Sequence, residues 1–152
     1  MIDQKQLRGV IKYCLDGIGL YSKEAENLLM GTAAQESRLG TYLRQLGGGP
    51  ALGIMQMEPA TFNDIKINYL SYRSQLVSKI LGISGCLRLV PEYMEWNIAL
   101  SICMARIHYY RIPEPLPIDI ISMAHYWKKY YNTYLGSGTE KEFIDNYNTY
   151  CL

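Results

Sequence analysis

The sequence contains little phenylalanine, little net charge and no long apolar run. Of its aromatic residues, 14 are Tyr, 2 are Trp and only 2 are Phe. The formal net charge of +1 lacks the strong basic bias of a nucleic-acid-binding protein, so we expect no nucleic-acid partner. The most apolar stretch, residues 96–105, is too short to cross a bilayer, so we expect no membrane insertion. Tyrosine has an apolar face and a polar tip, which suits either an ordinary core or a wet groove for sugars or peptides.

Patterns typical of metal binding and redox chemistry are also missing. The four cysteines form no CxxC pair and no Cys/His cluster with the spacing of metal ligands. Cys14 and Cys103 fall on apolar stripes, which favours buried free thiols. The even number of cysteines, which also include Cys86 and Cys151, leaves disulfide pairs as the alternative. The sequence therefore predicts no metal site.

The length and the apolar pattern predict one mostly α domain over residues 1–152. A chain of 152 residues suits a single domain with a substantial core, and its apolar residues recur at helical spacing. Asp3, Ser22 and Thr139 are capping residues at the starts of three predicted helices. Pro59 suits the first position of another helix. One long apolar helix is predicted from Pro91 to about Arg111.

Glycines interrupt the helical pattern between residues 40 and 57. Gly47, Gly48, Gly49, Pro50 and Gly53 crowd this stretch, which predicts irregular backbone or a short β-hairpin. The expected fold class is therefore mostly α, with a small hairpin as its only sheet element.

Glu36 is the candidate catalytic residue. It continues the apolar stripe that includes Leu29 and Ala33, so it lies on the buried face at the end of the predicted second helix. Burial disfavours a charged carboxylate and raises its pKa, as a general acid near neutral pH requires. The alternative is a glutamate that frays into solvent or pairs with Arg38 or Arg44.

Polar candidates follow in the segment from residue 53 to residue 62. Gly53 permits a positive φ or a close backbone approach. Gln56 offers both a donor and an acceptor, as an acetamido sugar requires. Glu58 directly precedes Pro59, so it is either a helix cap favoured by the helix dipole or a second carboxylate of a groove.

A third segment, residues 124–133, is dense in aromatic residues. Trp127 and Tyr131 lie one helical turn apart, so they either pack together in a core or present rings on which sugars stack. His125 stands close to lysines in the next turn, and we expect it on the surface without a catalytic role.

The first two segments together resemble the lytic transglycosylase family, which is related to goose-type lysozyme. Gln35-Glu36-Ser37 resembles the Glu-Ser motif that this family carries at the end of a helix. Residues 52–61 resemble its Gly-Leu-Met-Gln motif with a Pro-x-Thr tail. Either motif alone is weak, but the two in this order and at this distance are fairly specific.

The resemblance continues towards the C-terminus. Residues 97–110 resemble the long helix of the family. Residues 124–126 resemble the start of its Ala-x-Tyr-Asn motif, but Trp127 stands where Asn is usual, and Tyr131-Asn132 is an alternative match. The sequences of these segments are similar to those of small members of the family that bacteriophages encode.

The resemblance implies a lysozyme-like fold with a substrate groove between two lobes. Glu36 would protonate the glycosidic oxygen between N-acetylmuramic acid and N-acetylglucosamine in the glycan strands of bacterial peptidoglycan. No metal or organic cofactor is implied. The residues implied in substrate binding are Ser37, Gly53, Met55, Gln56, Glu58, Tyr126, Trp127 and Tyr131.

Three functional alternatives remain at this point. In a transglycosylase, Glu36 then takes the proton of the sugar's own 6-hydroxyl group, and a 1,6-anhydro ring closes. In a hydrolytic lysozyme, Glu36 and Glu58 together activate a water. A virion or wall-binding protein would keep the fold without turnover. Because residues 1–7 are polar and no apolar signal segment follows, we expect synthesis in the host cytoplasm and delivery to the wall by another route.

Overall fold

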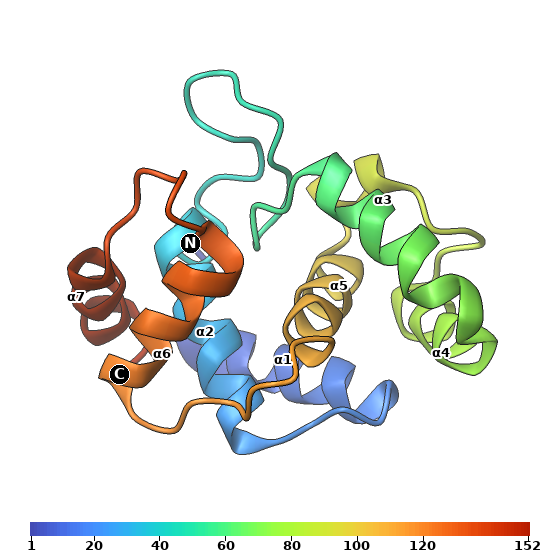
Figure 1. The fold of residues 1–152 in the computed structure, drawn as a ribbon, viewed down its shortest axis with the longest axis horizontal. Coiled ribbons are helices and arrows are strands. Elements are labelled where there is room, and N and C mark those ends of the chain that lie inside the picture. The colour runs from blue at the N-terminus through green and yellow to red at the C-terminus, as the bar shows by residue number, and fades with distance from the viewer.

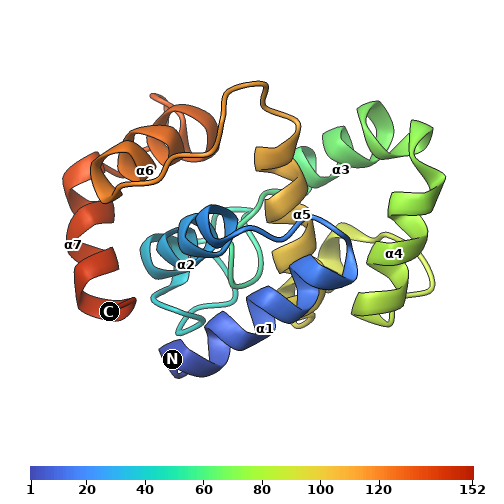
Figure 2. The same ribbon diagram turned by 90° about the horizontal axis from the view of Figure 1, so that it is seen from below.

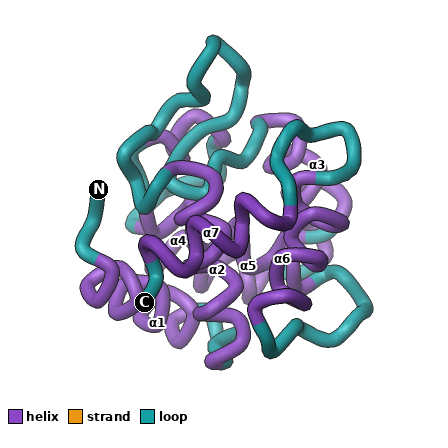
Figure 3. The backbone as a smooth tube through the Cα atoms, turned by 90° about the vertical axis from the view of Figure 1, so that its left-hand side faces the viewer, coloured by secondary structure: helices purple, strands orange, loops and turns teal.

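The computed structural model, which describes residues 1–152, consists of helices and loops without a sheet (Figures 1 and 3). It confirms the prediction of a mostly α fold. The α-helices are α1 (Gln4–Gly17), α2 (Lys23–Ser37), α3 (Pro59–Asn68), α4 (Ser74–Ser84), α5 (Ile98–Tyr110), α6 (Ile120–Trp127) and α7 (Glu140–Tyr150). Shorter helical turns are the 3-10 helices η1 (Leu70–Tyr72) and η2 (Pro91–Glu95) and the π-helix η3 (Lys128–Asn132).

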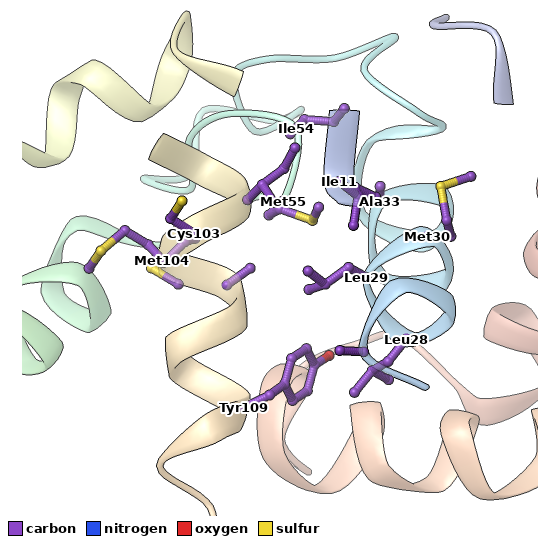
Figure 4. Close-up of a cluster of buried hydrophobic side chains, with 14 of the residues drawn as sticks. Ile11, Leu28, Leu29, Met30, Ala33, Ile54, Met55, Cys103, Met104 and Tyr109 are labelled. Atoms are coloured by element: carbon purple, nitrogen blue, oxygen red, sulfur yellow. The ribbon is translucent and has the colours of Figure 1, made fainter. Parts of the chain in front are cut away.

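The helices form two groups on either side of the chain's centre (Figures 1 and 2). On one side α6 and α7 pack against α2, and on the other side α3 and α4 pack against α5. Helix α1 contacts both α2 and α5. One cluster of 35 buried hydrophobic residues runs through both groups. Figure 4 shows part of this cluster, including Leu29 of α2, Tyr109 of α5 and Met55 of the loop between α2 and α3.

Three predicted caps start the helices at the expected residues. The Asp3 carboxylate accepts from the backbone N–H groups of Lys5 and Gln6 at 3.1 Å, and α1 begins at the next residue. The Ser22 hydroxyl accepts from the third residue of α2 in the same way, and Thr139 does so for α7. Such a cap contributes about 1 kcal/mol and sets where the helix begins.

Helix α2 ends immediately after Glu36, in a turn that holds the helix end rigidly. Arg38 and Leu39 both adopt left-handed backbone conformations, with φ of 48° and 52°. The Leu39 N–H reaches back six residues to the Ala33 carbonyl oxygen at 3.1 Å, and the Leu39 side chain is buried. The Ser37 hydroxyl donates to the Ile54 carbonyl oxygen at 2.7 Å and accepts from the Gly40 N–H at 2.9 Å. These contacts join the end of α2 to the loop that follows.

The glycine-rich loop between α2 and α3 contains no β-strand. Only the isolated bridges Arg44–Leu52 and Leu52–Met57 occur, so the backbone is irregular rather than a hairpin. Gly53 has a φ of +79°, and a β-carbon there would overlap the Met94 carbonyl oxygen. This glycine is therefore required both by its φ and by the close approach of η2.

The predicted single helix from Pro91 to about Arg111 is wrong, because it is broken near its start. Pro91–Glu95 forms the 3-10 helix η2, and Asn97 then adopts an extended conformation with φ of −99° and ψ of 96°. The Asn97 side chain accepts from the Leu100 N–H at 2.9 Å and caps α5. An asparagine inside an apolar run therefore starts a new helix, in agreement with its capping preference.

Single residues and turns complete the description of the helices. Val10 and Ile121 are 40% and 68% exposed, since each lies one residue off its helix's buried stripe. Helix α4 continues to Ser84, and Gly85 provides its left-handed cap. Residues 113–117 form a non-helical connection between α5 and α6.

A π-helix continues α6 and turns the chain toward α2. The Lys128 ammonium group at its start donates to the Gly138 carbonyl oxygen at 2.7 Å, to the Gly136 carbonyl oxygen at 3.0 Å and to the Asn132 side chain at 2.7 Å. These bonds fold the following loop back over η3. Single-turn π segments are frequent at functional sites because they shift the register of one helical face.

Gly53 is required for two reasons, its positive φ and its close contact with η2, and together they predict an effect on stability. We expect Gly53→Ala to destabilise the fold clearly more than Gly47→Ala, measured by urea unfolding. Both glycines have positive φ, so both variants carry a left-handed strain of roughly 1–2 kcal/mol. Only Gly53 also meets other atoms, because nothing lies within 4 Å of a β-carbon at Gly47. Equal losses in the two variants would show that the contact with η2 does not constrain this loop.

Candidate active site

A cavity of about 650 Å³ opens beside the C-terminal end of α2. Its lining comes from the end of α2, the following loop, the start of α3, α5, η3 and α7, so both groups of helices contribute to it. Only 6 of its 20 lining residues are hydrophobic, and three of these are the tyrosines Tyr42, Tyr130 and Tyr131. The other lining residues include five uncharged amides, namely Gln35, Gln45, Gln56, Asn132 and Asn146.

The Glu36 carboxyl group lines this cavity from the last turn of α2. Burial raises its pKa to about 7, and a hydrogen bond from Trp127 lowers the pKa by a smaller amount. Glu36 forms no ion pair with Arg38 or Arg44, and Arg44 pairs with Glu95 instead. Glu36 is thus half-buried at the end of α2, where the apolar stripe places it, and it neither frays into solvent nor pairs with an arginine. A carboxyl group with this pKa exchanges its proton near neutral pH, as general acid–base catalysis requires.

Two tyrosines close the apolar side of the site. Tyr109 of α5 and Tyr131 of η3 stack with their ring centroids 5.3 Å apart. Burial raises the pKa of both phenols well above the ordinary value, and the nearby charge of Glu36 raises them further. Both side chains are therefore neutral across the physiological range. Their rings supply the low-dielectric surroundings that keep Glu36 protonated.

Three of the eight predicted binding residues line the cavity, namely Gln56, Glu58 and Tyr131. Gln56 has a φ of 47°, and its side-chain amide donates to the Gly53 carbonyl oxygen at 2.9 Å. Its side-chain oxygen is left for a ligand. The Tyr131 hydroxyl donates to the Met55 carbonyl oxygen at 2.6 Å, so its ring rather than its proton faces the cavity.

Glu58 occupies the N-cap position of α3 without capping it. Its side chain makes no hydrogen bond with the first turn, so the helix-cap alternative is wrong. The exposed Glu58 carboxylate lines the cavity instead, and Glu142 of α7 lines it as well.

The other five predicted binding residues do not line the cavity. Ser37 and Met55 have no exposed surface, because Ser37 ties α2 to the loop and Met55 packs in the core. Gly53 is buried against η2. Tyr126 is 5% exposed, and its hydroxyl donates to the Glu114 carbonyl oxygen at 3.2 Å. Trp127 is fully buried, and its indole N–H donates to the Glu36 carboxyl group.

His108 is a cavity residue that the sequence analysis missed. Its Nε2 lies 2.9 Å from the Tyr130 carbonyl oxygen, and Arg111 donates to its Nδ1 at 3.4 Å. A carbonyl only accepts, so Nε2 carries the proton and the tautomer is fixed. Burial, together with the charge of Arg111, lowers the His108 pKa to about 4. Arg111 also donates to the Asp64 carboxylate at 2.7 Å. The contacts of Asp64, Arg111 and His108 thus connect α3 to η3 beside the cavity.

The remaining candidates carry structural roles or none. Cys14, Cys103 and Cys151 are buried and Cys86 is half-buried, and all four thiols are free rather than disulfide-bonded. His125 is exposed, as expected. No cluster of three or more His, Cys, Asp or Glu side chains is placed to hold a metal ion. None of the helices combines the length and the apolar character needed to cross a bilayer.

Comparisons with known proteins give no relative from which a function can be transferred. No family model matches the sequence, and neither a curated protein nor a solved structure matches it.

The raised pKa of Glu36 predicts a pH-dependent effect of Glu36→Gln on stability. The unfolded chain loses this proton near its ordinary pKa of 4.5, whereas the folded protein holds it up to about pH 7. Burying the carboxylate therefore costs nothing below pH 4.5, costs progressively more up to pH 7 and stays constant above it. The full cost is about 3 kcal/mol. Urea unfolding across this range should show Glu36→Gln gaining stability relative to the parent as pH rises. A difference independent of pH would contradict the raised pKa.

Proposed function

We propose that the protein cleaves the glycan strands of bacterial peptidoglycan with Glu36 as its acid catalyst. The observation that carries this proposal is a single buried carboxyl group of pKa about 7 on the wall of a largely polar cavity. Amides and hydroxyls bind the acetamido and hydroxyl groups of amino sugars, and tyrosine rings stack on sugar faces. The order of the Glu36 and Gln56 motifs supports the same substrate class. We further propose that the helices adopt a lysozyme-like arrangement in which the cavity is the substrate groove.

In the proposed reaction, Glu36 first acts as an acid and then as a base. It gives its proton to the glycosidic oxygen between N-acetylmuramic acid and N-acetylglucosamine, and the bond from that oxygen to the muramic acid C1 breaks. The Glu36 carboxylate then takes the proton of the sugar's 6-hydroxyl group while that oxygen bonds to C1. The products are a free N-acetylglucosamine hydroxyl group and a 1,6-anhydro ring, and Glu36 is protonated again.

The electrostatics of Glu36 favour this one-carboxylate route over a two-carboxylate lysozyme. Two closely placed carboxyl groups raise each other's pKa, because a second negative charge disfavours ionisation. Glu58 and Glu142 both line the cavity, yet only burial and the Trp127 hydrogen bond account for the pKa of Glu36. We therefore propose a lytic transglycosylase, in which Glu58 and Glu142 bind substrate and do not act as a nucleophile or base.

We predict that Glu36→Gln lowers the clearing of purified peptidoglycan by about a hundredfold to ten-thousandfold, the usual contribution of general acid catalysis. Glutamine keeps the size of the side chain and the acceptor oxygen for Trp127 but has no acidic proton. Glu92→Gln is the matched control, because it removes the same charge from an exposed position outside the cavity. A folded Glu36→Gln protein that clears walls within about tenfold of the parent rate would refute the assignment. A parent protein that binds walls without clearing them would favour the non-catalytic alternative.

The products and the Glu58→Gln variant together decide the reaction type. We expect mass spectrometry to find 1,6-anhydro ends, 18 mass units (about one water) lighter than reducing ends, because no water enters the proposed reaction. We also expect Glu58→Gln to reduce clearing by less than Glu36→Gln does, since Glu58 is exposed and lies outside the proton transfer. Reducing ends, together with a Glu58→Gln variant as inactive as Glu36→Gln, would establish a two-carboxylate hydrolase instead.

A further inference from the structure

The protons around Glu36 can be assigned one by one from the hydrogen bonds of its neighbours. The Thr32 hydroxyl donates to the Leu28 carbonyl oxygen at 2.8 Å, so its oxygen accepts from the Tyr109 hydroxyl at 2.9 Å. The Tyr131 hydroxyl donates to the Met55 carbonyl oxygen. Both tyrosine protons therefore point away from Glu36.

Trp127 supplies the hydrogen bond that Glu36 receives. Its indole Nε1 donates to Glu36 Oε1 at 3.0 Å. The indole is fully buried and packs against Phe143 with ring centroids 5.3 Å apart. A β-carbon at Gly138 would lie 2.7 Å from the far edge of the indole, so this loop also confines the ring. The N–H is thus fixed in place before any substrate binds.

We propose that Trp127 is a positioning residue that decides which oxygen of Glu36 carries the catalytic proton. This inference rests on the proposed function. An indole N–H only donates, so the oxygen that faces it stays unprotonated in the acid. The proton of neutral Glu36 is therefore held on Oε2, and Oε2 is the atom that gives it to the glycosidic oxygen and later accepts the hydroxyl proton.

The same N–H stabilises Glu36 after the first proton transfer. A hydrogen bond to a carboxylate is stronger than one to the neutral acid, so Trp127 favours the charged form and lowers the Glu36 pKa. Removing the N–H should therefore raise this pKa and leave the carboxyl group free to rotate.

Other titratable groups near Glu36 do not account for such a change. Tyr109 of α5 and Tyr131 of η3 face Glu36, and both stay neutral because their pKa values are raised well above the ordinary value. His108 lines the same cavity and is neutral above about pH 4. The charged side chains of the cavity lining are Arg38, Glu58 and Glu142, and none of them sets the pKa of Glu36.

The test compares Trp127→Phe with Phe143→Leu. Trp127→Phe removes the N–H and keeps an aromatic ring against Phe143, whereas Phe143→Leu disturbs the packing of the indole and keeps its N–H. Each protein is labelled with ¹³C-glutamate, and the Glu36 carboxyl resonance, identified by its absence in Glu36→Gln, is titrated with pH. We expect the Glu36 midpoint to rise in Trp127→Phe and to stay at the parent value in Phe143→Leu.

Activity on peptidoglycan provides the second measurement. The acid must be protonated, so the rate falls as pH rises through the Glu36 pKa, and this fall should move to higher pH in Trp127→Phe. The rate at the optimum should drop by about tenfold to a hundredfold, because the carboxyl group is no longer held in one orientation. If Trp127→Phe does not fold, a benzothienylalanine introduced at position 127 replaces only the N–H by sulfur and serves the same comparison.

An unchanged or lowered Glu36 midpoint without the N–H would overturn the inference, and so would an equal rise in Phe143→Leu. The titration needs no substrate, so it separates this inference from the proposed function. A raised midpoint in a protein that never cleaves peptidoglycan would refute the function and keep the role of Trp127. Cleavage by the parent protein with an unchanged midpoint would refute only the role of Trp127.

Discussion

The burial of one carboxyl group is the constraint on which the arrangement of the cavity depends. Glu36 ends a helix whose preceding turns, including Leu29 and Ala33, lie entirely in the core, so its side chain enters the low-dielectric region that those turns create. Tyr109 and Tyr131 close that region from α5 and η3. The carboxyl group stays protonated there because the protein offers it no cation and one neutral donor.

Strained backbone gathers around the same carboxyl group. Four residues other than glycine have positive φ, and three of them, Arg38, Gln56 and Thr133, line the cavity. Such conformations cost of order 1–3 kcal/mol each and persist only where the surrounding packing holds them. Here the packing comes from the core beneath α2, from Lys128 and its three acceptors, and from the contact of Gly53 with η2.

The parts of the fold that follow from local chemistry were predictable from the sequence. Asp3, Ser22 and Thr139 cap their helices because the relevant bonds span three residues, and Glu36 is half-buried because it continues the apolar stripe of α2. The break at Asn97 was missed, since hydrophobic spacing cannot show that a side chain will cap rather than point outward. The partners of Trp127 and His108 were missed for another reason. They lie 91 and 22 residues away, and only the packed structure brings them together.

The two influences on Glu36 suit a group that must both give and take a proton. Burial alone would stabilise the acid and produce a carboxylate too costly to form after the first transfer. A cation at the same distance would stabilise the carboxylate and leave too little acid at neutral pH. A buried, neutral N–H lies between these extremes, because it favours the charged form without bringing a charge of its own. The resulting pKa of about 7 makes the acid and the base nearly equal in population at neutral pH. That balance is what a single carboxylate requires if it is to serve both steps of one reaction.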